Sequence, residues 1–251
     1  MKDKVAIITG AAGDIGMAIA RRFLQAGAKL ALLDVDIDAL RLRCARDLPE
    51  ADPSSLLCLA CDVSDAHATK TCVDTVAEKL GGLHVLVNNA APFTPTHKLA
   101  DLPVAQWNLT LAVNATGAFL MSKWSIPHMR ACGGGVILNI ASQMGHVTAP
   151  GRGAYGASKA ALLSLTRSIA VDHAQDNIRC VSISPGAVMT GRLVRRYGSE
   201  AAAGQALAPH YPAKRIGLPD EVATAAVFLC GDGAAFVTGT DLLVDGGYTA
   251  I

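Results

Sequence analysis

The sequence predicts an α/β fold, a single-domain, doubly wound parallel β-sheet with helices on both faces. Short apolar runs alternate with longer helical segments along the chain, which is the order of parallel strands joined by right-handed crossovers. The length of 251 residues suits one large domain. No linker-like stretch or internal repeat divides the chain, so we expect one domain over residues 1–251.

The N-terminal half follows this alternation closely. Predicted strands cover residues 5–9, 29–33, 56–61 and 84–87. Helical patterns fill the intervals at about 15–27, 38–47 and 65–80. In the first helix, Ile15, Ile19, Phe23 and Leu24 recur at helical spacing, so we expect them to face the core.

The C-terminal half continues with longer helices and one irregular segment. Predicted helices cover residues 106–129, 154–175 and 220–229, and a further strand covers 136–140. Residues 188–216 mix Gly, Pro and Ala with charge, as a mobile substrate lid would. Its arginines, Arg192, Arg195 and Arg196, are candidates for binding an acidic substrate, although a solvated face is the simpler interpretation.

Composition excludes several functional classes. Apolar residues make up 51% of the chain and charged residues 17%, which is typical of a compact globular protein. The net charge is +1 and no Lys/Arg run stands out, so neither nucleic acid nor an anionic membrane is an expected partner. No apolar span reaches about 18 residues. The N-terminus does not resemble a signal peptide, so we expect a cytoplasmic protein.

The seven cysteines and seven histidines form no metal-ligand or disulfide pattern. Cys58 and Cys61 lie three residues apart in an apolar run that is predicted to be a buried strand, where their side chains point to opposite faces. We therefore expect buried free thiols, a reducing compartment and no metal. His146 is the one histidine that we place near a pocket mouth, because it closely follows Ser142.

A phosphate-binding turn is predicted between the first strand and the first helix. Gly10, Gly13 and Gly16 allow the sharp turn that brings a helix N-terminus against a pyrophosphate. Asp34 stands 18 residues after Gly16, at the end of the second strand, where a carboxylate can accept hydrogen bonds from ribose hydroxyls. These features predict a dinucleotide site. The alternative for Asp34 is an ordinary cap of the following turn.

Tyr155 and Lys159 are four residues apart in a predicted helix, so they share one face. An ammonium about 4 Å from a phenolate, at an effective dielectric of about 20, stabilises it by roughly 4 kcal/mol, or about three pKa units. That shift brings a phenol near neutrality, where an acid/base catalyst is most effective. The alternative is a packed tyrosine above a solvated lysine.

Six motifs in order closely resemble the short-chain dehydrogenase/reductase family, over nearly the whole chain. They are Thr9-Gly10 with Asp14-Ile15-Gly16 (TGxxxGxG), Asp62-Val63, Asn88-Asn89-Ala90 (NNAG), the set Asn114, Ser142, Tyr155 and Lys159, Pro185-Gly186 with Thr190, and the closing strand and turn at 243–247. The resemblance implies a Rossmann-like fold and a cofactor site made of Gly10, Asp14, Ile15, Gly16, Asp34, Asp62, Val63, Asn89, Ala90, Tyr155, Lys159, Pro185, Gly186, Val188 and Thr190.

The resemblance also implies the catalytic roles. Tyr155 would exchange the hydroxyl proton of an alcohol, and Lys159 would lower the phenol pKa and bond the nicotinamide ribose. Ser142 would bond the reacting oxygen, and Asn114 would hold a water that passes the proton onward from Lys159. Taken alone, a serine at a strand end is usually a turn former and an asparagine in a helix is usually a solvent-facing polar residue.

Two positions depart from the family pattern. Asp14 replaces the middle glycine of the cofactor turn, and Ala91 replaces the last glycine of the NNAG segment. A carboxylate aimed at a pyrophosphate would be repelled, so we expect the Asp14 side chain to turn away and to cap the first helix. The alanine is a small change, with little expected effect.

We therefore expect an oxidoreductase that transfers a hydride between a secondary alcohol (a sugar, polyol, alicyclic or similar compound) and NAD. NAD is expected over NADP, because Asp34 and Asp36 would face the extra phosphate with like charge. A non-catalytic dinucleotide-binding sensor is the alternative. A hydrolase is disfavoured, since Ala160 stands where the nucleophile elbow has its last glycine and no strand leads into it. A homotetramer is expected because two long helices are apolar on more than one face.

Overall fold

All seven strands of the sheet run parallel, in the order β3-β2-β1-β4-β5-β6-β7. A computed structural model of the chain describes residues 1–251. The strands are β1 (Val5–Thr9), β2 (Lys29–Asp34), β3 (Leu56–Ala60), β4 (Val85–Asn88), β5 (Gly135–Ile140), β6 (Ile178–Pro185) and β7 (Asp241–Val244). The predicted doubly wound parallel sheet of the Rossmann type is confirmed.

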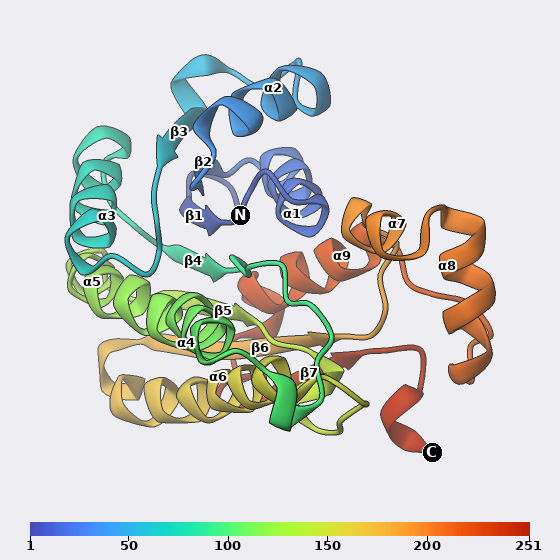
Figure 1. The fold of residues 1–251 in the computed structure, drawn as a ribbon. Coiled ribbons are helices and arrows are strands. Elements are labelled where there is room, and N and C mark those ends of the chain that lie inside the picture. The colour runs from blue at the N-terminus through green and yellow to red at the C-terminus, as the bar shows by residue number, and fades with distance from the viewer.

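Helices cover both faces of this sheet (Figure 1). One layer contains α1 (Asp14–Gln25), α2 (Ile37–Asp47) and α9 (Pro219–Cys230), and the other contains α3 (Ala66–Leu80), α4 (Val104–Leu111), α5 (Gly117–Ala131) and α6 (Gly153–Asp172). Successive strand residues supply the two cores alternately. In β1, Ala6 and Ile8 pack under the first layer, and Val5 and Ile7 under the second.

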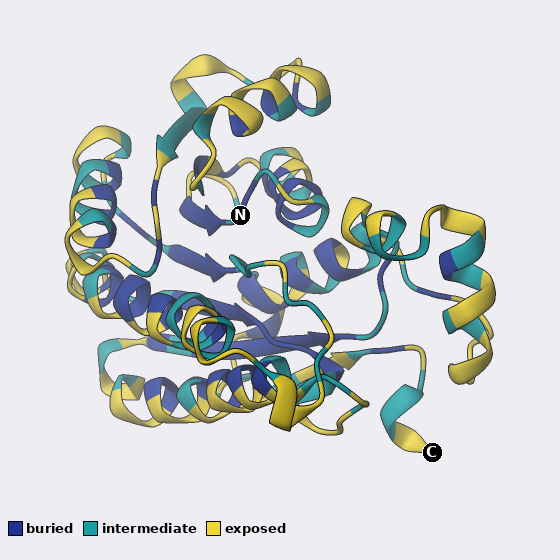
Figure 2. Ribbon diagram, in the orientation of Figure 1, coloured by how far each residue is buried: buried dark blue, intermediate teal, exposed yellow.

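The central strands are buried and the edges of the sheet are not (Figure 2). β1 and β4 are buried along their whole length, as expected for strands covered on both faces. The prediction of a buried strand at 56–61 is wrong in this respect, because β3 is an edge strand that is half-buried at Cys58. The seven cysteines are free, and Cys58 and Cys132 are only partly covered.

The predicted helix at 106–129 is interrupted. α4 ends at Leu111, a π-helical turn covers Ala112–Thr116, and α5 then continues to Ala131. π-turns are rare overall, but those that occur are often found at functional sites. Here it contains Asn114, which is buried and bonded to a neighbouring helix. α6 ends at Asp172, short of the predicted Gln175, because a 3₁₀ turn follows at Ala174–Asp176.

The segment predicted as a lid is mostly helical. It contains α7 (Gly191–Tyr197) and α8 (Glu200–Leu207), which pack on each other at one end of the molecule (Figure 1). Gly198 joins them with φ 88°, a left-handed conformation that a glycine adopts without strain. None of the helices combines the length and the apolar composition needed to cross a bilayer.

The strand order places the functional region. The order reverses between β1 and β4, and in open α/β sheets ligands bind outside the carboxyl ends of the strands at this switch point. The turn after β1 and the segment after β4 meet there. A Cβ on Gly10 would lie 2.7 Å from Cα of Ala90, so the close approach requires a glycine.

Candidate active site

A cleft of about 1110 Å³ opens at the carboxyl ends of the strands. It is bounded by the glycine turn, the ends of β2 to β6 and the predicted lid. Every predicted catalytic and cofactor residue lines it except Asn114. The motifs spread over the sequence are therefore brought together in one place.

The glycine turn is held open from behind by Asn89. Its side-chain amide donates to the carbonyl oxygens of Thr9 (2.9 Å) and Gly10 (3.0 Å). A Cβ on Gly16 would lie 2.8 Å from that amide nitrogen, so the turn cannot accept a side chain there. The helix that follows has Gly13 as its N-cap, which supplies no side-chain acceptor to the first amides of α1. These donors and this close backbone fit the pyrophosphate of a dinucleotide.

Two carboxylates, Asp34 and Asp62, line the same part of the cleft as the glycine turn. Asp34 Oδ2 accepts from the amide of Ala12 at 2.9 Å, and no basic side chain pairs with it. Asp62 accepts from the amide (2.9 Å) and the hydroxyl (2.7 Å) of Ser64 in a tight turn. Asp34 therefore ties the end of β2 to the glycine turn and is free of a neutralising cation, which fits an acceptor for ribose hydroxyls.

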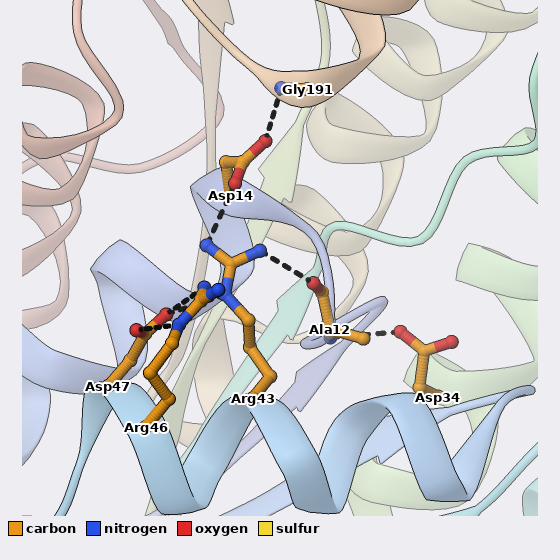
Figure 3. A network of polar contacts seen from close by, with 7 residues as sticks. All are labelled: Ala12, Asp14, Asp34, Arg43, Arg46, Asp47 and Gly191. Atoms are coloured by element: carbon orange, nitrogen blue, oxygen red, sulfur yellow. Dashed lines mark hydrogen bonds and ion pairs between the residues drawn. The ribbon is translucent and has the colours of Figure 1, made fainter.

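Asp14 stays in the lining of the cleft and does not cap the helix, so both expectations for its side chain are wrong. Figure 3 shows its two partners. It is the first residue of α1, after the N-cap Gly13. Its Oδ2 accepts from the amide of Gly191 at 2.7 Å, and its Oδ1 accepts from Arg43 Nη2 at 2.8 Å. The carboxylate thus contacts the start of the lid rather than its own helix.

Arg43 on α2 completes this network and was not predicted as a site residue. Besides Asp14, it donates to the carbonyl of Ala12 at 3.3 Å and to Asp47 at 2.5 Å (Figure 3). The sequence displays only the Arg43–Asp47 spacing of four, which is typical of a surface ion pair on a helix. The contact with the glycine turn depends on how α2 packs, which the local pattern does not contain.

The catalytic candidates gather where α6 faces the end of β5. Tyr155 and Lys159 share one face of α6, as predicted. Ser142 lies close enough to the Tyr155 phenol to act on its pKa, and its Oγ accepts from the amide of Met144 at 3.2 Å. Lys159 Nζ donates to the carbonyl of Ile140 at 2.7 Å and lies 5.7 Å from the centre of the Tyr155 ring.

The pKa values differ from the sequence expectation. Tyr155 stays partly accessible from the cleft, yet burial raises its pKa, against smaller lowering effects of the Ser142 hydrogen bond and the Arg192 charge. Burial lowers the pKa of Lys159 to about 7, and the charge of Arg192 adds to this. The expected lowering of the phenol pKa by Lys159 is therefore not found. Lys159 is itself desolvated, and one of its N–H groups donates to the carbonyl of Ile140 rather than to the phenol.

Asn114 reaches the site from behind. Its Nδ2 donates to Ser158 Oγ at 2.9 Å, and Ser158 Oγ donates to the carbonyl of Tyr155 at 2.8 Å. Its Oδ1 is buried and has no hydrogen-bond partner. A buried acceptor of this kind fits a donor from outside the chain. Its role in holding a relay water stays a prediction.

The predicted lid contributes arginines to the cleft. Arg192 donates to the carbonyls of Ala91 (2.8 Å) and Pro92 (3.2 Å), and Arg196 donates to that of Thr94 (3.0 Å). Arg195 also lines the cleft, and none of the three pairs with a carboxylate. They therefore connect the lid to the segment after β4 through backbone oxygens while keeping their full positive charge.

Arg152 is a further lining residue that the sequence interpretation missed. Its guanidinium carbon lies 5.9 Å from the centre of the Tyr155 ring, and it forms no ion pair. Its position three residues before Tyr155 in sequence was the available signal. His146, in contrast, pairs with Asp241 at 2.7 Å and does not line the cleft.

Tyr211 and Gln143 form a buried pair behind the end of β6. The Tyr211 hydroxyl accepts from the amide of Ala187 at 2.7 Å and from Gln143 Nε2 at 3.1 Å. A Cβ on Gly186 would lie 2.9 Å from both side chains. The Pro185-Gly186 turn therefore packs closely against the segment that contains Ser142. No group of three or more His, Cys, Asp or Glu side chains is placed to hold a metal ion.

Comparisons with known proteins give the following matches. A family profile described as enoyl-(acyl carrier protein) reductase matches residues 10–249. The chain is 40% identical over 250 residues to a 2-(R)-hydroxypropyl-CoM dehydrogenase of Xanthobacter autotrophicus, with 99% of each chain covered. It is 37% identical to an NAD-dependent glycerol dehydrogenase of Listeria innocua, over 98% of this chain and 94% of the relative. The crystal structure of a short-chain type dehydrogenase/reductase from Mycobacterium marinum superposes with a TM-score of 0.92 at 30% identity, covering 100% of this chain and 97% of that one.

Proposed function

The chain belongs to the short-chain dehydrogenase/reductase family, and we propose that within it the protein is an NAD-dependent dehydrogenase of secondary alcohols. The observation that carries this proposal is the grouping of Tyr155, Lys159 and Ser142 beside a groove suited to a dinucleotide. The Xanthobacter relative is named for a 2-hydroxypropyl substrate, in which the hydroxyl is on a secondary carbon.

NAD would accept the hydride, and residues of the chain would transfer the proton. Ser142 holds the hydroxyl oxygen of the alcohol, and Tyr155 takes its proton. The raised pKa of Tyr155 makes the phenol the major form near neutrality. The rate of alcohol oxidation, which needs proton removal, should therefore increase with pH, and the rate of the reverse reaction, which needs proton donation, should increase as the pH falls. Lys159, with a pKa of about 7, can accept or release a proton near neutrality and is suited to pass it on.

The cofactor preference rests on Asp34. Its carboxylate stands at the end of β2 without a cation beside it, so it is suited to accept from ribose hydroxyls. The additional phosphate of NADP would meet this charge at close range, which disfavours NADP by about a hundredfold or more. The Listeria relative is named as NAD-dependent, which supports the same preference.

We extend the proposal to alcohols that carry an anionic group. Arg152, Arg192, Arg195 and Arg196 line the cleft, and none of them has a carboxylate partner. The carboxylates that line it, Asp14, Asp34 and Asp62, are all at the dinucleotide end. Beyond the dinucleotide end the cleft is therefore lined by positive charge, which attracts a substrate of the opposite sign.

A turnover assay tests these statements together. Purified enzyme is given NAD or NADP and a panel of secondary alcohols, and reduced cofactor is measured by absorbance. A hydroxy carboxylate and its methyl ester form a matched pair, because only the acid carries the charge. We expect Arg152→Met to raise KM for the acid and to leave KM for the ester nearly unchanged. If no alcohol is oxidised while NAD binds tightly, the sensor alternative is the better description.

A homotetramer is part of the proposal. Val104 and Leu109 on α4 and Phe119 on α5 are 73%, 47% and 46% exposed, so these two helices present large apolar side chains to solvent. Packing of these helices against a second copy of the chain would bury the three side chains. Light scattering at micromolar concentration tests it, and a monomeric mass would contradict it.

A further inference from the structure

Asp14 joins two parts of the chain that are 177 residues apart. Its Oδ2 accepts from the amide of Gly191 at 2.7 Å (Figure 3). Gly191 is the first residue of α7 in the predicted lid, and Asp14 is the first residue of α1 after the glycine turn. One hydrogen bond therefore connects the lid directly to the cofactor turn.

The lid residue held in this way is next to a proposed cofactor contact. Thr190 precedes Gly191 and is the N-cap of α7, but its side chain makes no capping bond, so the hydroxyl is available to a ligand. Both residues line the cleft. The bond from Asp14 to Gly191 consequently limits where the Thr190 hydroxyl can lie relative to the glycine turn.

A carboxylate beside a pyrophosphate site needs a nearby cation. Arg43 provides it at 2.8 Å from Asp14 Oδ1, and the two side chains are 24% and 28% exposed, so solvent screens the pair only in part. Arg43 also donates to the carbonyl of Ala12, whose amide is bound by Asp34. The network thus extends from the ribose carboxylate, through the turn, to the lid (Figure 3).

We propose that Asp14 is a positioning residue that fixes the first turn of the lid against the cofactor turn, so that the two ends of the dinucleotide site are assembled together. This inference rests on the proposed function only in taking the groove to bind a nicotinamide dinucleotide. The departure of Asp14 from the glycine of the family pattern then has a use, because a glycine has no side chain to reach Gly191.

Three variants separate the hydrogen bond from the charge. Asp14→Asn keeps an oxygen acceptor for Gly191 and removes the charge, Asp14→Ala removes both, and Asp38→Asn removes a charge from the exposed first turn of α2 without touching the lid. The measurements are Kd for NADH by fluorescence titration, KM for NAD, kcat, and amide hydrogen exchange of the segment 188–198.

We expect Asp14→Ala to raise the NADH Kd and the NAD KM about fivefold relative to Asp14→Asn, the size of one ordinary hydrogen bond. kcat at saturating NAD should change far less, because Tyr155, Lys159 and Ser142 are untouched. Exchange at 188–198 should rise in Asp14→Ala and stay near wild type in Asp14→Asn and Asp38→Asn. Exchange in β1 and β2 should be unchanged in all three variants.

Equal NADH affinity and equal exchange in Asp14→Ala and Asp14→Asn would overturn the proposal. So would a rise in exchange over the whole chain, which would indicate a general loss of stability. NADH binding and exchange need no alcohol, so they test Asp14 even if no alcohol is turned over. A failure of the proposed dehydrogenase activity would appear separately, as NADH binding without turnover.

Discussion

Replacement of Lys159 by methionine should stabilise the protein, and the gain should shrink as the pH rises. Lys159 is 3% exposed, and burial lowers its pKa from 10.5 to about 7. Between these two values the unfolded chain binds a proton that the folded chain does not. The stability of the wild type therefore increases with pH across this window. The loss of folding free energy caused by burying the Lys159 amine is largest below pH 7.

The size of the effect follows from the shift. Each pKa unit corresponds to about 1.4 kcal/mol, so the shift of Lys159 gives a penalty of about 4 kcal/mol at pH 7 and about 2 kcal/mol at pH 9. Methionine fills a similar volume and has no charge to desolvate. It also leaves the Ile140 carbonyl without its donor, at a cost of about 1–3 kcal/mol that does not depend on pH. The difference between variant and wild type should therefore fall by about 2 kcal/mol from pH 7 to pH 9.

Calorimetry without added NAD measures this difference as a change in Tm. For a chain of this length, 2 kcal/mol corresponds to about 4–8 °C. Lys98→Met at an exposed position is the matched control, because a solvated lysine pays no burial penalty. The series ends at pH 9 because the raised pKa of Tyr155 affects stability at higher pH. A Tm difference for Lys159→Met that does not change between pH 7 and pH 9 would contradict this prediction, since it would mean that the buried amine keeps its ordinary pKa.

Three further predictions concern activity, cofactor choice and stability. Tyr155→Phe should remove nearly all turnover while NADH still binds, because only the proton-carrying group is lost, and substantial residual turnover would contradict the mechanism. Asp34→Ala should reduce the preference for NAD over NADP, which we expect to be about a hundredfold in kcat/KM, mainly by weakening NAD binding. Similar kcat/KM values for the two cofactors in the wild type would contradict this prediction. Tyr211→Phe should lower stability by about 1–3 kcal/mol, because the partly buried Ala187 amide loses its acceptor. Tyr248→Phe, whose ring packs on Tyr211, is the control and should cost less.

The sequence predicted the sheet and the assembly of the site because both depend on local patterns. Apolar runs, helical spacing and the glycine turn identified nearly every element, and the ends of parallel strands necessarily meet at one edge. The exposure of β3 and the π-turn before α5 could not be predicted from local patterns. Whether a strand is at an edge, and whether a helix contains a π-turn, depend on which elements pack beside it. Asn114 lies in the π-turn and bonds Ser158 of α6, a contact that the local pattern does not contain.

The errors at Asp14 and Lys159 have a common physical origin. A capping role for Asp14 and a phenol-tuning role for Lys159 were both inferred from the nearest partner along the chain. In the structure each side chain instead bonds a backbone group of a different element, Gly191 for Asp14 and Ile140 for Lys159. Local rules most often fail where a polar group serves a site rather than its own helix.

The directions of the Tyr155 and Lys159 pKa shifts have a consequence for catalysis. Burial disfavours the phenolate and the ammonium separately, so above about pH 7 the favoured state of the pair is a neutral phenol beside a neutral amine. Movement of one proton from Tyr155 to Lys159 creates both charges on one helix face, where each offsets the desolvation of the other. The total charge of the buried pair is unchanged by this step. The pH dependence of alcohol oxidation should therefore report apparent pKa values of the pair rather than of the tyrosine alone.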